Sequence, residues 1–155
     1  MDEKAQFFQI LRDWMDAFMH RSMSGWHHFT RTAGLSMPQL SILMQLHYKG
    51  PCGMSEISER FDITAAAASQ LVDKLVIAGY LKRAEDPHDR RAKQLTLSAS
   101  GAELIKRGIE ERYRWMDHLA ETLSETDQQK VSEALLLLTK AAKEMDLKEF
   151  NIQVK

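Results

Sequence analysis

Apolar side chains recur at helical spacing along most of the chain, beginning close to its start. Over residues 5–33 they return at three- and four-residue steps, which is the period of an amphipathic α-helix. The apolar stripe is wide for a surface helix, so we expect this helix to face both its own core and a partner chain. Gly34 suits the helix end because glycine tolerates a left-handed backbone conformation. The stripe consists of Phe7, Phe8, Leu11, Trp14, Met15 and Phe18, and continues toward Ser22 and Trp26.

A second helix is predicted to begin at Ser36. Ser36 and Gln39 have the spacing of a capping box, and Pro38 is tolerated in a first helical turn. The sequence Gly50-Pro51-Cys52-Gly53 is typical of a stop. The side chains expected to point inward are Leu40, Leu43, Met44 and Leu46 or His47.

The next segment has the layout of a helix-turn-helix, in which two helices are joined by a turn of three or four residues. Ser55 suits the N-cap of a short helix that contains Ile57 and Phe61, and residues 62–64 suit the turn. Thr64 then suits the N-cap of a helix over residues 65–78, which Gly79 ends. Its inward side chains are expected to be Ala68, Leu71, Val72 and Leu75. An αα-corner in a helix bundle would give the same pattern.

A β-hairpin is predicted directly after these helices. Residues 80–83 and 93–97 form its strands, and the charged residues 86–91 connect them. A two-stranded hairpin is marginal alone, so Leu81, Leu95 and Leu97 must pack on the helices behind it. Ser98 suits the cap of a long helix that extends to about residue 122. A last helix is predicted from Ser124 onward, with apolar positions Val131, Leu135, Leu138 and Met145.

Charge and composition add local information to this pattern. The formal net charge of the chain is −1, so any nucleic-acid surface must be local. Residues 64–98 hold six cationic and four acidic side chains, a net charge of +2. The single cysteine, Cys52, excludes a disulfide within one chain, and its position next to glycines leaves open whether its thiol is exposed and oxidisable. No secretory leader or membrane span is recognised, so a cytoplasmic location is expected.

The hairpin tip carries the most specific motif. Asp89, Arg90 and Arg91 are followed by Leu95-Thr96-Leu97-Ser98 and Gly101. Together with two earlier groups of residues, this motif resembles the MarR family of winged helix-turn-helix repressors over nearly the whole chain. The first group is Gly34-Leu35-Ser36 with Gln39 and Leu43, and the second is residues 71–75 (LVDKL) with residues 79–81 (GYL). The resemblance implies a mainly α (α+β) fold, a single domain over 1–155. In it, a DNA-binding lobe spans residues 36–98, and residues 1–33 and 99–155 form an intertwined dimerisation region.

The resemblance also implies a homodimer that binds a pseudo-palindromic operator in double-stranded DNA, as a ligand-responsive repressor. Arg91 matches the arginine that enters the minor groove, and Asp89 matches the acidic residue that supports it. Arg90 is expected to contact phosphate. The first turns of the predicted recognition helix, Thr64, Ala65, Ala66, Ser69 and Gln70, would face the major groove, and Lys74 a phosphate. The family often has arginine at the position of Gln70, so specificity is expected to depend on the wing and on DNA shape.

A ligand cleft is implied by the same resemblance. Small aromatic or phenolic anions bind family members between the dimer helices and the DNA lobe, and His20, Leu40 and Met44 fall near that cleft. Ordinary core or interface packing is the alternative explanation for each of these residues. The histidines have no tight ligand spacing, so neither a metal nor another cofactor is expected.

Two other classes of function are alternatives to DNA binding. The first is a winged-helix module that binds another protein without binding DNA, although such a module would not need Arg90 and Arg91 projected together. The second is an enzyme. No nucleophile with a base, phosphate-binding glycine loop or zinc spacing is present, so catalysis is not expected.

Overall fold

The structure, a computed structural model, describes residues 2–85 and 93–145 of the 155-residue chain. The chain forms two compact units, Met1–Arg114 and Trp115–Lys155. Within the described ranges, no helix is long and apolar enough to cross a membrane.

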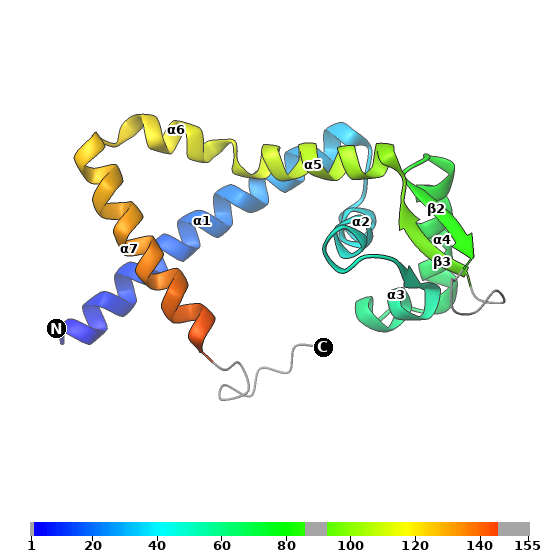
Figure 1. The fold of residues 1–155 in the computed structure, drawn as a ribbon, viewed down its shortest axis with the longest axis horizontal. Coiled ribbons are helices and arrows are strands. Elements are labelled where there is room, and N and C mark those ends of the chain that lie inside the picture. Colours follow the sequence, from blue (N-terminus) through cyan, green and yellow to red (C-terminus); the bar gives the residue numbers. More distant parts are fainter. Residues whose placement is uncertain (1, 86–92, 146–155) are drawn as a thin grey trace. The chain divides into compact units, whose positions relative to one another are not determined.

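The first unit combines helices with a small sheet (Figure 1). Two long helices run beside each other, and the sheet lies next to the pair of short helices of the predicted helix-turn-helix. In chain order the elements are α1 (Glu3–Ala33), α2 (Met37–Lys49), β1 (Cys52–Gly53), α3 (Met54–Phe61), α4 (Ala65–Ile77), β2 (Leu81–Glu85), β3 (Lys93–Leu97) and α5 (Ala99–Tyr113).

The sheet is antiparallel, with strand order β1-β3-β2. On the central strand β3, Leu95 pairs with Cys52 on one side and with Arg83 on the other. The predicted hairpin is therefore confirmed for its described strands. Strand β1 was not predicted, because two residues have no periodicity and a Gly-Pro-Cys-Gly sequence is typical of a turn.

The core of the first unit lies where α1, α2, α4 and α5 meet the sheet. The side chains of Leu43, Ile57 and Ile105 are fully buried. Most of the predicted inward positions are confirmed as buried, whereas His47 is exposed and Ile42, which was not predicted, is buried. The confirmed buried residues are Leu40, Leu43, Leu46, Ala68, Val72, Leu75, Leu81 and Leu95.

Helices α1 and α5 approach each other closely because glycines lie at their crossing. A Cβ on Gly108 would lie 2.7 Å from Cε1 of Phe29 and 2.8 Å from Cζ3 of Trp26. A Cβ on Gly25 would lie 3.0 Å from Cα of Arg112. The contact between these helices therefore depends on residues without a side chain.

Most helix starts follow the predicted capping signals. The hydroxyl of Ser36 accepts the backbone N–H of Gln39, and the Gln39 side chain in turn accepts the backbone N–H of Ser36. Thr64 and Ser98 cap α4 and α5 through the hydroxyl alone, which accepts the backbone N–H of Ala67 and Gly101 respectively. Gly34 has the expected left-handed conformation with φ 67°.

Two predicted boundaries of helices in the first unit are wrong. Helix α3 begins at Met54, with Gly53 and not Ser55 as its N-cap, because the Glu56 carboxylate accepts the backbone N–H of Gly53 at 3.4 Å. The single long helix predicted after Ser98 ends at Tyr113. Arg114 keeps right-handed helical torsions, φ −52° and ψ −34°, so the interruption needs no glycine or proline and leaves no sequence signal.

The second unit contains α6 (Trp115–Thr122) and α7 (Glu125–Glu144). Ser124 caps α7, as predicted, and its hydroxyl accepts the backbone N–H of Asp127 at 3.2 Å. The side-chain amide of Gln128 donates to the carbonyl oxygens of Ala120 and Leu123 and so links the two helices. Met145 lies beyond the end of α7, although it was predicted to be part of that helix.

Candidate nucleic-acid interface

The turn between α3 and α4 is built from local backbone hydrogen bonds. Asp62 has a left-handed conformation with φ 50°, and its N–H donates to the carbonyl oxygens of Glu59 and Ser58. The N–H of Ile63 also donates to the carbonyl of Ser58, at 3.0 Å. Thr64 then begins α4, since its hydroxyl accepts the N–H of Ala67 at 3.2 Å. These bonds produce the predicted helix-turn-helix.

Helix α4 buries one face and exposes the other. Ala68, Val72 and Leu75 are fully buried against the rest of the lobe. The predicted DNA-facing residues are largely at the surface: Thr64, Ala65, Ala66, Gln70 and Lys74 are exposed, and Ser69 is half-buried. The helix therefore offers a mostly uncharged surface in its first turns, with a cation in its last turn.

An ion pair joins the recognition helix to the hairpin. The guanidinium of Arg83 on β2 binds the carboxylate of Asp73 on α4, and the hydroxyl of Ser69 donates to the same carboxylate at 3.3 Å. Sequence reasoning treated Arg83 only as one positive charge in the segment. The pairing of opposite charges across the α4–β2 connection was the available signal, but it does not by itself specify a contact.

The end of α4 is also attached to the start of α5. The hydroxyl of Ser98 donates to the carbonyl of Gly79 at 2.6 Å and accepts the N–H of Gly101 at 2.9 Å. The N–H of Ser98 donates to the carbonyl of Tyr80 at 3.0 Å. Gly101 lies so close that a Cβ there would be 2.1 Å from the Tyr80 carbonyl oxygen. This cluster explains why serine and glycine follow the hairpin in the motif.

The predicted tip residues Asp89, Arg90 and Arg91 lie outside the described residues. Their neighbours on the strands are described, and the last pair of the hairpin register is Glu85 with Lys93. The connection that holds the two arginines therefore follows directly from strands that α4 and α5 support.

Two of the three predicted ligand residues lie together. Leu40 and Met44 line a cavity of about 350 Å³ between α1, α2 and α3, whereas His20 lies on the exposed surface of α1 and does not line it. The cavity is mostly apolar, and its lining includes one cationic side chain from α2 and one from α3. Its other lining residues are Trp26, Met37, Ser41, Gln45, Tyr48, Lys49, Arg60 and Phe61.

The sequence left open whether the Cys52 thiol is exposed, and the structure shows that it is not. Its side chain is buried, and its strand pairs with β3. Burial, together with the nearby carboxylate of Glu56, raises the pKa of the Cys52 thiol and so disfavours the reactive thiolate. Within residues 2–85 and 93–145, no three histidine, cysteine or acidic side chains come together as metal ligands.

Known proteins resemble this chain in sequence and in fold. Residues 33–92 match the sequence model of the MarR family. The chain is 29% identical over 107 residues to the HTH-type transcriptional regulator YfiV of Bacillus subtilis, over 69% of this chain and 67% of that protein. The crystal structure of transcriptional regulator Tm0710 from Thermotoga maritima has a TM-score of 0.78 at 26% identity, covering 96% of this chain and 99% of that one.

A second similar structure is that of a mutant of MepR from S. aureus bound to an oligodeoxyribonucleotide. Its TM-score is 0.62 at 17% identity, over 92% of this chain and 99% of that chain, so the likeness is one of fold. The family match covers the helix-turn-helix and the first strand of the hairpin, and the fold extends the likeness over nearly the whole chain. On these grounds, residues 33–92 match the MarR family in sequence, and the chain resembles HTH-type transcriptional regulators in sequence and a transcriptional regulator of known structure in fold.

Proposed function

We propose that this protein binds an operator in double-stranded DNA as a homodimer and represses transcription until a small ligand releases it. The observation that carries the proposal is the pairing of an exposed recognition helix with a supported β-hairpin. Helix α4 keeps Ala66, Gln70 and Lys74 at the surface, one turn apart, while Asp73 holds Arg83 of the hairpin. A helix of this size fits the major groove of B-DNA.

The side chains on α4 suggest modest direct reading of bases. Gln70 is long enough to bond the adenine edge through two hydrogen bonds, and the methyl groups of Ala65 and Ala66 can contact a thymine methyl. Ser69 has a weaker claim, because its hydroxyl already donates to Asp73. Lys74 is suited to a backbone phosphate.

The hairpin tip supplies the other part of the proposed contact. Arginine is favoured in a narrow minor groove, where the negative potential is strongest. We assign that role to Arg91, with Asp89 orienting it and Arg90 on a phosphate. MepR, which shares this fold, has been solved with an oligodeoxyribonucleotide, and this supports DNA as the partner.

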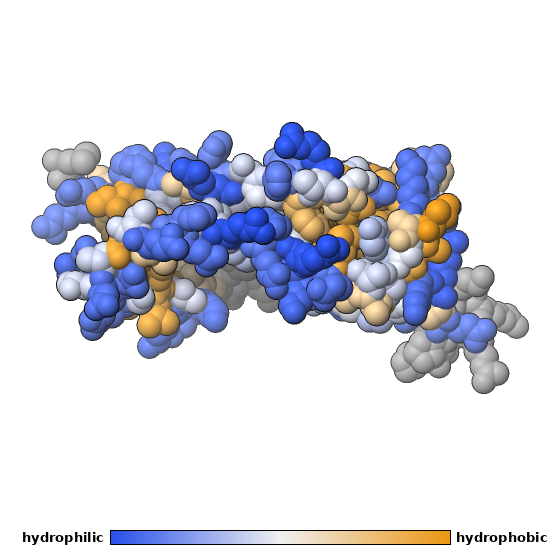
Figure 2. Space-filling model, turned by 90° about the horizontal axis from the view of Figure 1, so that it is seen from above, coloured by the Kyte–Doolittle hydropathy of each residue, from blue (hydrophilic) through white to orange (hydrophobic). Residues whose placement is uncertain are grey.

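Exposed apolar side chains support the homodimer. The first half of α1 exposes Phe7, Phe8 and Ile10 to 56–61%, and α7 exposes Leu136 and Leu137 to 71%. Figure 2 shows hydrophobic residues at the surface between hydrophilic ones. Apolar surface of this kind marks an interface, because burying it gains about 25 cal/mol per Å². We assign residues 1–33 and 99–155 to dimerisation and residues 36–98 to DNA.

The cavity next to Leu40 and Met44 is the proposed effector site. Its apolar floor suits an aromatic ring, and Lys49 and Arg60 at its margin suit a carboxylate or phenolate. It also includes Phe61, the residue directly before the turn to α4. An aromatic anion bound here would therefore contact the DNA lobe close to its recognition helix. His20 does not line the cavity, so we do not assign it a contact with the effector.

The decisive experiment is DNA binding by fluorescence anisotropy, with duplexes from the region flanking the protein's own gene. We expect Arg91→Ala to weaken binding at least tenfold at matched salt, with the dimer unchanged in analytical ultracentrifugation. Lys140→Ala, which removes an exposed cation from α7, is the matched control and should have little effect. Affinity should also fall steeply with added salt, because phosphate contacts release counterions. Equal affinity for wild type and Arg91→Ala would refute the wing assignment, and a monomer at micromolar concentration would refute the dimer.

A further inference from the structure

One side of α1 carries a series of potential metal ligands that the proposed function does not use. Because an α-helix has about 3.6 residues per turn, side chains three and four positions apart are neighbours, with Cβ atoms about 5–6 Å apart. From residue 16 to residue 27, every member of this series has an oxygen, a sulfur or a nitrogen that can bind a metal. The members are Asp16, Met19, His20, Met23 and His27.

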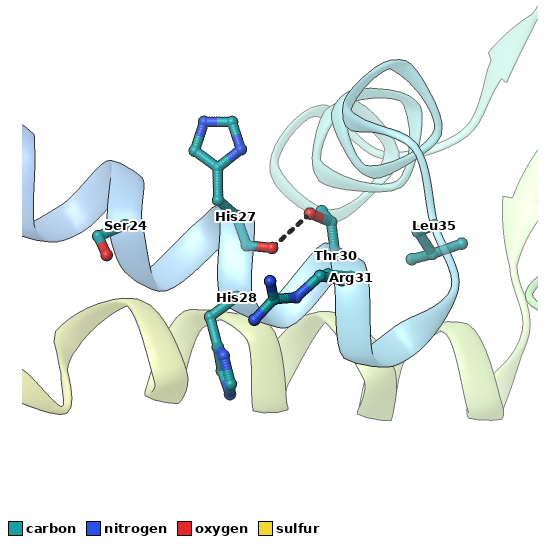
Figure 3. A pocket seen from close by; sticks show the side chains of 6 residues that line it. All are labelled: Ser24, His27, His28, Thr30, Arg31 and Leu35. Carbon is teal, nitrogen blue, oxygen red and sulfur yellow. Dashed lines mark hydrogen bonds between the residues drawn. The ribbon is translucent and has the colours of Figure 1, made fainter.

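These side chains lie at the boundary between the solvent and the core. Met19 is 45% exposed, and His20 and His27 are also exposed. Met23 is partly buried and packs against the core of the first unit. Figure 3 shows the imidazoles of His27 and His28 extending to opposite sides of α1. Because Met23 lies one turn before His27, His27 shares its side of the helix and His28 does not.

The His20 imidazole is available to a metal. Within residues 2–85 and 93–145, it forms no ion pair with a carboxylate. Asp16 lies four positions earlier, which is the spacing at which a carboxylate can accept the N–H of the second ring nitrogen. Histidines that bind metals usually have such a partner, which fixes the orientation of the ring.

The chemistry of the ligands indicates which metal they suit. Thioethers are soft ligands that select Cu(I), whereas zinc sites use cysteine, histidine and carboxylate side chains. In the described part of the chain, no three histidine, cysteine or acidic side chains come together as metal ligands. The two thioethers are therefore needed to complete a set of three ligands on α1, and this favours Cu(I) over zinc.

We propose that α1 binds Cu(I) through the Sδ atoms of Met19 and Met23 and a ring nitrogen of His20. Asp16 is a positioning residue that orients the His20 ring. None of the three ligands lines the proposed effector cavity, so the two sites are separate. The Cu(I) site does not depend on DNA binding and its tests contain no DNA, so their failure would leave the proposed function unaffected.

The first test measures the affinity of the full-length protein for Cu(I), without oxygen and with ascorbate as reductant, by competition with the chelator bicinchoninate. We expect saturable binding and at least a tenfold loss of affinity in Met19→Leu, which keeps an apolar side chain of similar volume. His20→Asn should lose as much. The matched controls are His28→Asn and Met145→Leu, which remove an exposed imidazole and an exposed thioether outside the site. Their affinities should stay within twofold of the wild type.

The second test identifies the atoms that bind the metal. Isotopically labelled methionine methyl groups are followed by NMR as Ag(I), a soft cation that also prefers thioethers, is added to the protein. We expect the signals of Met19 and Met23 to shift together and to saturate, while the signal of Met145 stays unchanged. The proposal is overturned if the Met19 and Met23 signals do not move, if Met19→Leu binds Cu(I) as tightly as the wild type, or if Met145→Leu loses as much affinity as Met19→Leu.

Discussion

Replacing Gly101 by alanine tests how tightly α5 is attached to the recognition helix. The added Cβ would lie 2.1 Å from the Tyr80 carbonyl oxygen, whereas real Cβ atoms stay beyond 3.0 Å. The obstacle is backbone, so α5 must move by roughly 0.9 Å. That shift strains the hydrogen bonds from Ser98 to the carbonyls of Tyr80 and Gly79, which are 3.0 and 2.6 Å long. Strain of about 1–3 kcal/mol and two weakened hydrogen bonds of about 1 kcal/mol each outweigh the better helix propensity of alanine, about 1 kcal/mol.

We therefore expect Gly101→Ala to lower the free energy of unfolding by about 3 kcal/mol. The assay is urea unfolding followed by circular dichroism at one fixed protein concentration, because a dimer's stability depends on concentration. Gly53→Ala is the matched control, since its Cβ would lie 3.7 Å from the Ser55 hydroxyl, an ordinary contact. Its free energy of unfolding should fall by no more than about 1 kcal/mol, because the only cost is the weaker N-cap preference of alanine.

A second variant keeps the test informative if Gly101→Ala does not fold. Ser98→Ala removes the hydroxyl that accepts the Gly101 N–H and donates to the Gly79 carbonyl, and should cost about 1–2 kcal/mol. If both Gly101→Ala and Ser98→Ala unfold at the wild-type urea concentration with the wild-type slope, the close attachment of α5 does not stabilise the lobe and the reasoning fails.

Three further outcomes follow from single contacts. Burial raises the pKa of the Cys52 thiol, so labelling with a disulfide reagent should be slow in the native protein and fast in urea; rapid native labelling would contradict its burial. Asp73→Asn and Arg83→Gln should show a coupling of about 0.5–1 kcal/mol in a double-mutant cycle of urea unfolding, and strictly additive losses would mean that the ion pair contributes nothing. The hydrogen bond from Ser124 lowers the pKa of Asp127, so its carboxylate stabilises the fold above its unfolded pKa and this contribution is lost as pH falls through the folded pKa. Between about pH 5 and pH 2, the Tm of Asp127→Asn should therefore fall by less than the Tm of the wild type. An identical dependence of Tm on pH in the two proteins would argue against this linkage.

The sequence predicts those features that depend on neighbouring residues. A cap forms between residues three positions apart, so Ser36 with Gln39 and Thr64 with Ala67 follow directly from the sequence. A left-handed helix end favours glycine, and Gly34 and Gly79 both have positive φ, although α3 ends on the left-handed Asp62. The same reasoning fails at Ser55, because Glu56 reaches back to Gly53 and moves the cap.

Features that depend on distant segments could not be predicted. Cys52 is buried because its short strand pairs with Leu95, and no local pattern indicates that pairing. The contact of Asp73 with Arg83 depends on how β2 leaves the end of α4. The hairpin was predicted from alternation alone, whereas the roles of Asp89, Arg90 and Arg91 at its tip remain predictions.

The backbone contacts of α5 also limit how a ligand can act on the lobe. At one end, Gly101 lies against Tyr80 at the end of α4; farther along, Gly108 lies against Phe29 of α1. The first contact is with backbone and the second is with the rings of Phe29 and Trp26, so a shift of α5 meets the Tyr80 carbonyl at one end and two aromatic side chains at the other. We therefore expect a ligand that displaces α1 to shift the end of α4 as well. Under the proposed function, induction then changes the separation of two rigid lobes while the geometry within each lobe is kept. Only a ligand that binds one separation better than the other can cause that change.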